Sequence, residues 1–352
     1  MELSLLRSNE IGICGNGYRT DRTIQRKSGV GQYSAQSVHL YPSDRRWAMT
    51  QSLYERAPRS VLFLGPFIIL GAAIALLAIT SPLGDLEAIE TATTSEVLGT
   101  MVLIGLIVGI IPVAIGMLWF PFMRTLDHSK LHIVLALSVG VLAFVGVEMT
   151  EEAIEYAAVA PSPGLATGLA IGGFIGTFVL MVGVSKWSLA RAKQSGNRGL
   201  GVAYLVALGL GLHSLGEGIA IGSSLLLGEA ALATLLIVGF ILDDVTEGPT
   251  IVAAVARDAE APPFLHFGAL GVIAGGPVVL GGWIAAVAFS PLMAAALLAV
   301  GIGAIAQVIW QVVDLIQFDA PQVLTRGNIS GFVGGFVFMF LLDEVFIDMI
   351  LL

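Results

Sequence analysis

Residues 200–255 read LGVAYLVALGLGLHSLGEGIAIGSSLLLGEAALATLLIVGFILDDVTEGPTIVAAV. They contain two apolar segments, 200–226 and 231–255, each long enough to cross a bilayer as a helix. Each segment has a polar cluster near its middle, His213-Ser214-Leu215-Gly216-Glu217-Gly218 and Asp243-Asp244-Val245-Thr246-Glu247-Gly248. A charge at the centre of a membrane helix costs roughly 2.5–3.5 kcal/mol. The clusters therefore need a compensating partner, and a bound cation is the natural candidate.

The rest of the chain has the composition of a membrane protein. Of its 352 residues, 56% are hydrophobic and only 12% are charged. Apolar segments of about 20 residues predict transmembrane helices. The nine predicted spans are 60–80, 97–122, 131–149, 164–184, 200–226, 231–255, 266–289, 292–316 and 330–351. The predicted fold class is an all-α polytopic membrane protein.

Three parts follow along the chain. Residues 1–57 are polar and weakly periodic, and we expect a disordered cytoplasmic tail. Residues 58–82 contain an extra transmembrane helix without polar groups of chemical interest, which predicts an anchor. Residues 97–352 contain the other eight spans, which we expect to form one transporter domain.

The charges in the connecting loops predict the orientation. With nine helices, all 17 Lys and Arg residues fall on one side, and the opposite loops carry acids such as Glu90, Glu151 and Glu229. Basic loops face the cytoplasm. This places the N-terminus in the cytoplasm and the C-terminus outside, in a multi-pass protein of the plasma membrane.

Helical spacing brings the polar residues of the two clusters together. His213 and Glu217 are four residues apart, as are Asp243 and Glu247, so each pair shares a helix face. Ser214 and Asp244 lie three residues before these glutamates. Two neighbouring antiparallel helices would direct all six side chains to one volume near mid-membrane. A buried hydrogen-bonded network or a proton relay without metal is the alternative.

The donor types predict which cation would bind. Imidazole and carboxylate suit divalent Zn, Fe, Mn or Co, and four acids with one histidine favour Mn or Fe. The absence of Cys or thioether ligands from the clusters argues against Cu(I). Pro249 removes the backbone hydrogen bond to the Val245 carbonyl, which we expect to contribute an oxygen to the site.

The two motifs resemble those of the ZIP family of divalent-metal transporters, over residues 97–352. His213-Ser214-x-x-Glu217-Gly218 is similar to the family's fourth-helix motif, and the second cluster is similar to that of the fifth helix. Gly331-Phe332-x-x-Gly335-Phe336 resembles its glycine-rich last helix. The resemblance implies an eight-helix ZIP-like core, a homodimer, and a helix group that carries the site past a scaffold. It implies primary ligands at His213, Glu217, Asp244 and Glu247, with Ser214 and Asp243 lining a second site.

Two further sets of residues are candidates for the transport pathway. Glu148 and Glu152 lie at the end of the third span, where they form either a cation funnel or a solvated helix end. Gln307, Gln311 and Asp314 share one helix face, where they either line a pathway or bond between helices.

The sequence therefore predicts a carrier that moves divalent transition metals into the cytoplasm. We expect no enzyme activity and no cofactor, because the chain has no phosphate-binding loop and no His-Glu-x-x-His motif of a metalloprotease. The expected partners are the metal ion, the lipid bilayer and a second copy, with no nucleic acid. The alternatives are a proton-coupled carrier of an organic solute and a metal-binding receptor without flux.

Overall fold

The computed structural model describes residues 57–80, 94–195, 198–256, 258, 261–320 and 322–342, and within these ranges the regular structure is entirely helical. The helices are α2 (Arg59–Thr80), α3 (Thr94–Gly105), η2 (Leu106–Ile110), α4 (Ile111–Met117), α5 (Phe120–Met123), α6 (His128–Val159), α7 (Pro163–Ser195), α8 (Arg198–Leu226), α9 (Ala230–Val255), α10 (Phe264–Gly275), α11 (Pro277–Ala288), α12 (Pro291–Asp319) and α13 (Arg326–Leu341). Except for its last residue, the predicted tail lies outside the described residues.

The protein is a multi-pass membrane protein by the length and composition of its helices. Seven helical segments of the described chain are long and apolar enough to span a bilayer. The other two predicted spans correspond to α9, which has 26 residues and three acids, and to α13, which is described over 16 residues. The third span is longer than predicted, since α6 continues to Val159 and includes the acids that follow residue 149.

Two predicted spans are interrupted at proline residues. Directly before Pro112 the helix widens into the π-helix η2, in which the Ile111 N–H donates to the Leu106 carbonyl five residues earlier. This wider turn accommodates the hydrogen bond that proline cannot make. The predicted span 266–289 divides into α10 and α11, and Pro277 is the first residue of α11. Proline is favoured there because a helix's first N–H groups have no intrahelical acceptor.

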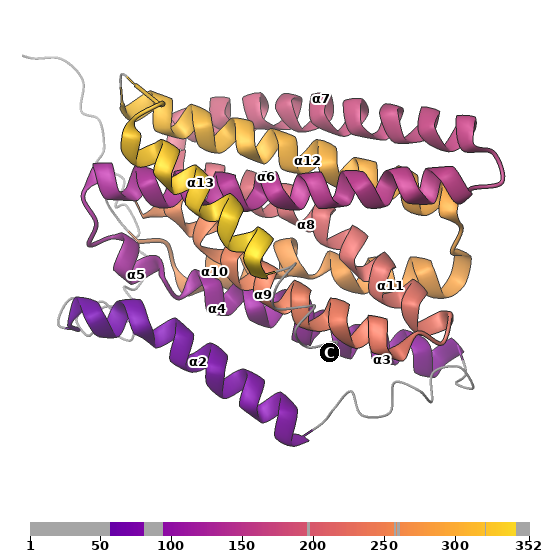
Figure 1. Ribbon diagram of the computed structural model, residues 1–352. Helices are drawn as coiled ribbons and strands as arrows, with labels where there is room; N and C mark the ends of the chain where they lie inside the picture. The colour runs from indigo at the N-terminus through magenta and orange to yellow at the C-terminus, as the bar shows by residue number, and fades with distance from the viewer. Residues whose placement is uncertain are drawn as a thin grey trace, which may run out of the picture. The chain divides into compact units, whose positions relative to one another are not determined.

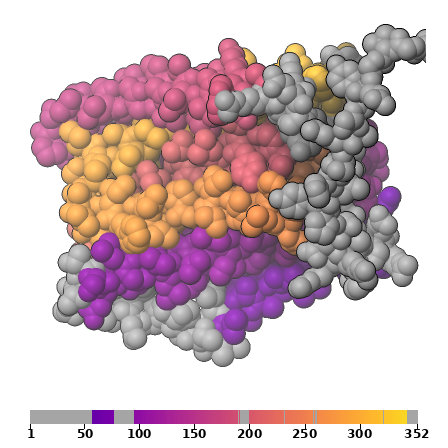
Figure 2. Space-filling model, turned by 180° about the vertical axis from the view of Figure 1, so that it is seen from behind, coloured from indigo at the N-terminus to yellow at the C-terminus, as the bar shows by residue number. Residues whose placement is uncertain are grey.

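The core helices pack as two groups (Figure 1). The α6 group consists of α6, α7, α12 and α13, and the α8 group consists of α3, η2, α4 and α8–α11. Seen from behind, α7 (magenta) lies at the top. Below it lie α12 (light orange), then α10 and α11 (orange), and then the violet helices α3–α5 (Figure 2). The two groups contact each other mainly between α12 and α8.

Glycines let the helix backbones touch inside each group. In the α8 group, a Cβ on Gly248 of α9 would collide with the backbone of Gly116 on α4. In the α6 group, a Cβ on Gly335 of α13 would collide with the Leu137 carbonyl on α6. Between the groups, Gly209 of α8 meets mainly the side chain of Val308, whereas a Cβ on Gly301 of α12 would come within 3.3 Å of the His213 Cα. Close backbone contacts therefore hold the helices of each group together, as is typical of small-residue packing in membranes.

The extra helix α2 is bound to the start of the core by aromatic residues. The Trp119 Nε1–H donates to the Phe63 carbonyl at 2.9 Å. The ring centroids of Phe67 and Trp119 are 4.8 Å apart, and those of Phe63 and Phe122 are 5.1 Å apart. The predicted anchor therefore also has a specific contact with α4 and α5.

Adjacent glycines of α13 test the backbone packing. Gly335→Ala should destabilise the protein by about 1–3 kcal/mol, because overpacking forces helices apart. Gly334→Ala is the matched control, since a Cβ there meets no atom of the described residues within 4 Å. Thermal unfolding of the purified variants measures both effects. Equal melting temperatures for the two variants would contradict the close approach of α6 and α13.

Candidate metal site

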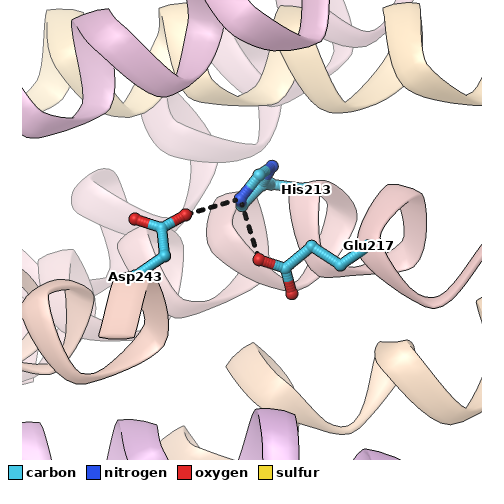
Figure 3. A group of neighbouring side chains, drawn as sticks. All are labelled: His213, Glu217 and Asp243. Carbon is cyan, nitrogen blue, oxygen red and sulfur yellow. Dashed lines mark ion pairs between the residues drawn. The ribbon is translucent and has the colours of Figure 1, made fainter. Parts of the chain in front are cut away.

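The two polar clusters lie on neighbouring helices, α8 and α9, which form a hairpin. The turn between them contains Gly228 with φ of 75°, a left-handed conformation that glycine adopts without strain. The antiparallel arrangement brings the middle of α8 beside the middle of α9. His213 and Glu217 on α8 therefore face Asp243 on α9, as the sequence predicts (Figure 3).

His213 is at the centre of this cluster. Its Nε2 is 3.4 Å from Glu217 Oε1, 3.6 Å from Asp243 Oδ2 and 3.8 Å from Glu247 Oε1. One donor atom from each of His213, Glu217 and Asp243 can be chosen so that all lie within 4.8 Å of one another. Donor atoms in a tetrahedral site with bonds of about 2.1 Å lie about 3.4 Å apart. The cluster therefore needs only small movements to hold a metal ion.

The cluster is buried, and most of its polar atoms lack hydrogen-bond partners among the described residues. Relative exposure is 2% for His213, 3% for Glu217 and 1% for Glu247. Within the described ranges, neither carboxylate oxygen of Glu217 or Glu247 has a hydrogen-bond partner, and His213 Nε2 also lacks one. Among the described residues, the ion pairs of Glu217, Asp243 and Glu247 are with His213 alone. Unpaired buried carboxylates are strongly unfavourable, so protons or a cation must neutralise them.

A cavity of about 150 Å³ adjoins the cluster. Residues of α6, α8 and α9 line it, together with Leu298 of α12, Met339 of α13 and Leu342, which directly follows α13. The lining includes Glu148 and Glu152 together with His213, Glu217 and Asp243. The two acids of α6 thus share a cavity with the cluster, which agrees with the funnel alternative for them. Its volume is enough for several waters.

Met149 belongs to the site although sequence reasoning missed it. Its sulfur lies 2.8 Å from His213 Nδ1, and its side chain is 5% exposed. If Nδ1–H donates to the sulfur, the Nε2 lone pair faces the carboxylates, as a metal ligand requires. The argument against Cu(I) considered the two clusters alone, and a thioether from α6 lies beside them. The motif itself contains no methionine, and α6 places this one beside it from 64 residues away.

Four predicted contributors lie outside the cavity lining: Ser214, Asp244, Glu247 and the Val245 carbonyl. Ser214 is fully buried, and its hydroxyl donates to the Leu210 carbonyl at 3.0 Å. Asp244 is fully buried with both carboxylate oxygens unpartnered, but Asp243 rather than Asp244 approaches His213. The Val245 carbonyl packs against Gly116 of α4 and fills the space of a Cβ there. It therefore belongs to a helix crossing, in contrast to the expected ligand role.

One polar residue of α12, Gln311, bonds to a neighbouring helix. Ser185 of α7 donates to Gln311 Oε1 at 2.5 Å, and Gln307 Nε2 donates to the same oxygen at 3.1 Å. Both glutamines are buried, whereas Asp314 is exposed. None of the three lines the cavity. The structure thus agrees with the interhelical alternative for Gln311, whereas the hydrogen bond of Gln307 stays within α12.

No family model and no curated protein sequence matches this chain. The family resemblance of the motifs remains a prediction from the residues quoted above. The fold and the geometry of the cluster are independent of it.

Replacing Met149 tests its contact with His213. Met149→Leu keeps an apolar side chain of similar volume but removes the sulfur acceptor. We expect metal affinity to fall about tenfold, the lower end of the effect of removing a partner from a metal-binding histidine. Met339→Leu is the matched control, because Met339 lines the same cavity. Titration of both purified variants with zinc measures this, and equal affinities would exclude an orienting role for the sulfur.

Proposed function

We propose that this protein transports divalent transition-metal ions across a membrane and binds them between α8 and α9. The single observation that supports this most is the convergence of His213, Glu217 and Asp243 in the interior of a membrane-spanning bundle. Imidazole nitrogen with carboxylate oxygens is a donor set for Zn, Fe, Mn or Co. The ion is the substrate, and its charge would offset the cost of the buried carboxylates.

The proposal extends to membership of the ZIP family, with eight core helices and α2 as an additional span. The division into an α6 group and an α8 group agrees with transport by a sliding helix group. The α8 group contains the site, and close backbone contacts such as that between Gly116 and Gly248 hold its helices together. Its interface with α12 includes side-chain contacts such as Gly209 with Val308, which can exchange partners during movement, and one close backbone approach, between Gly301 and His213.

We further propose the plasma membrane as the location and a homodimer as the assembly. The positive-inside distribution of Lys and Arg supports a cytoplasmic N-terminus and an external C-terminus. Uptake would then be directed inward. Glu148 and Glu152 would concentrate cations beside the site before they bind.

Uptake into proteoliposomes tests the proposal. Purified protein should take up zinc, manganese, iron(II) or cobalt saturably, and competition among these metals identifies the preferred substrate. Glu217→Ala and Glu247→Ala should reduce uptake by at least about a hundredfold, because each removes a charged ligand. The control is Glu151→Ala, since Glu151 is exposed and outside the cavity lining.

The other outcomes identify the alternatives. Metal binding without uptake would contradict transport and favour a receptor. Proton flux that needs Glu217 but no metal would favour a proton-coupled carrier of an organic solute. The absence of both binding and flux would leave the cluster without a metal function.

Transport should also depend on pH. Metal binding must displace protons from carboxylates that would otherwise be neutralised by them. At fixed metal concentration, we expect uptake to fall as the external pH is lowered from about 8 to 5.5, because protons compete for the same oxygens. Initial uptake rates under a clamped internal pH measure this. Constant rates over the range would contradict displacement of protons by the metal.

A further inference from the structure

A carboxylate outside the metal cluster links the start of α8 to the end of α9, the two ends of the hairpin that no turn connects. At one end, the turn at Gly228 connects the helices directly. At the other end, α8 begins at Arg198 and α9 ends at Val255, and no short connection joins them. There Asp258 accepts hydrogen bonds from the Gly199 N–H through Oδ1 and from the Leu200 N–H through Oδ2, both at 3.1 Å.

These bonds meet a requirement of the first turn of α8. The first N–H groups of a helix have no intrahelical acceptor, and a side chain close in sequence usually supplies one. Here the acceptor comes from the segment after α9, 59 residues from Gly199. The negative charge also interacts favourably with the positive end of the helix dipole. Asp258 thus caps α8 and also links its N-terminal end to the segment that follows α9.

The local sequence makes room for this contact. A Cβ at position 199 would collide with both Asp258 oxygens and with the Ala254 carbonyl, so only glycine fits there. Burial raises the pKa of the Asp258 carboxyl, while the two amide hydrogen bonds and the charge of Arg124 lower it. The carboxylate form therefore depends on these partners.

The metal cluster lies roughly midway between the Gly228 turn and the contact made by Asp258. His213 is about 20 Å from Gly199 along α8, at about 1.5 Å per residue, and the Gly228 turn is a similar distance away. If the open ends separated, the spacing between α8 and α9 would widen at the cluster. We infer that Asp258 is a positioning residue that holds the hairpin closed, so that His213 and Glu217 keep their spacing to Asp243 and Glu247.

This inference rests on the proposed function for its link to metal affinity, but the contact itself can be tested without metal. The variants are Asp258→Ala, which removes both acceptors, and Asp258→Asn, which keeps one. The matched control is Asp127→Ala. Asp127 accepts from the Lys130 N–H at 2.9 Å and caps α6, and in the described part of the chain its side chain bonds only within that helix.

Two measurements on the purified full-length protein decide the question. Hydrogen–deuterium exchange should become faster at residues 199–215 in Asp258→Ala, with a smaller change in Asp258→Asn. Titration with zinc alone should show affinity reduced by roughly fivefold in Asp258→Ala, since hydrogen bonds to a charged group contribute substantially to local stability. Asp127→Ala should leave both quantities unchanged.

The outcomes separate a positioning role from a general effect on stability. If exchange quickens only at Gly199 and Leu200 and zinc affinity is unchanged, Asp258 is an ordinary helix cap and the inference is wrong. Equal effects from Asp127→Ala would also overturn it. If the wild-type protein binds no zinc, the proposed function fails separately, and faster exchange as far as His213 still supports the closed hairpin, whereas unchanged exchange there rejects it.

Discussion

The burial of carboxylates around His213 is the constraint on which the rest of the account depends. Glu217, Asp243 and Glu247 lie in an apolar bundle with His213 as their ion-pair partner among the described residues. Each carboxylate that stays ionised there has a large desolvation cost, and one imidazolium cannot balance all of them. A divalent cation, with or without protons, supplies the missing charge. The same reasoning explains why the cluster is adjacent to a cavity rather than enclosed by close-packed side chains.

Helix packing determines whether these side chains can act together. Small residues allow the backbones of the α8 group to touch, as Gly218 does with the Val278 carbonyl on α11. Such contacts leave little freedom for one helix to shift alone. His213 meets the α6 group through the flexible side chain of Met149 and also through its backbone, since a Cβ on Gly301 of α12 would come within 3.3 Å of the His213 Cα. The site is therefore held in place by contacts with both groups.

Much of this could be predicted from the sequence, because it depends on local spacing. Helical periodicity placed His213 with Glu217 on one face, and the short connection to α9 placed Asp243 opposite them. The contacts of Met149 and Asp258 could not be predicted, since each joins segments far apart in the chain without a motif. The environment of the Val245 carbonyl could be predicted only in part. Pro249 correctly indicated a missing helical hydrogen bond, but only the packing of Gly116 shows where that oxygen points.

X-ray absorption spectroscopy of the zinc-loaded protein would test the central claim most directly. A site built on His213 predicts one imidazole nitrogen together with carboxylate oxygens at about 2.0–2.2 Å from the metal. The imidazole signal should disappear in His213→Ala while the oxygen shell remains. A zinc spectrum without imidazole, or one that His213→Ala leaves unchanged, would contradict a metal site between α8 and α9.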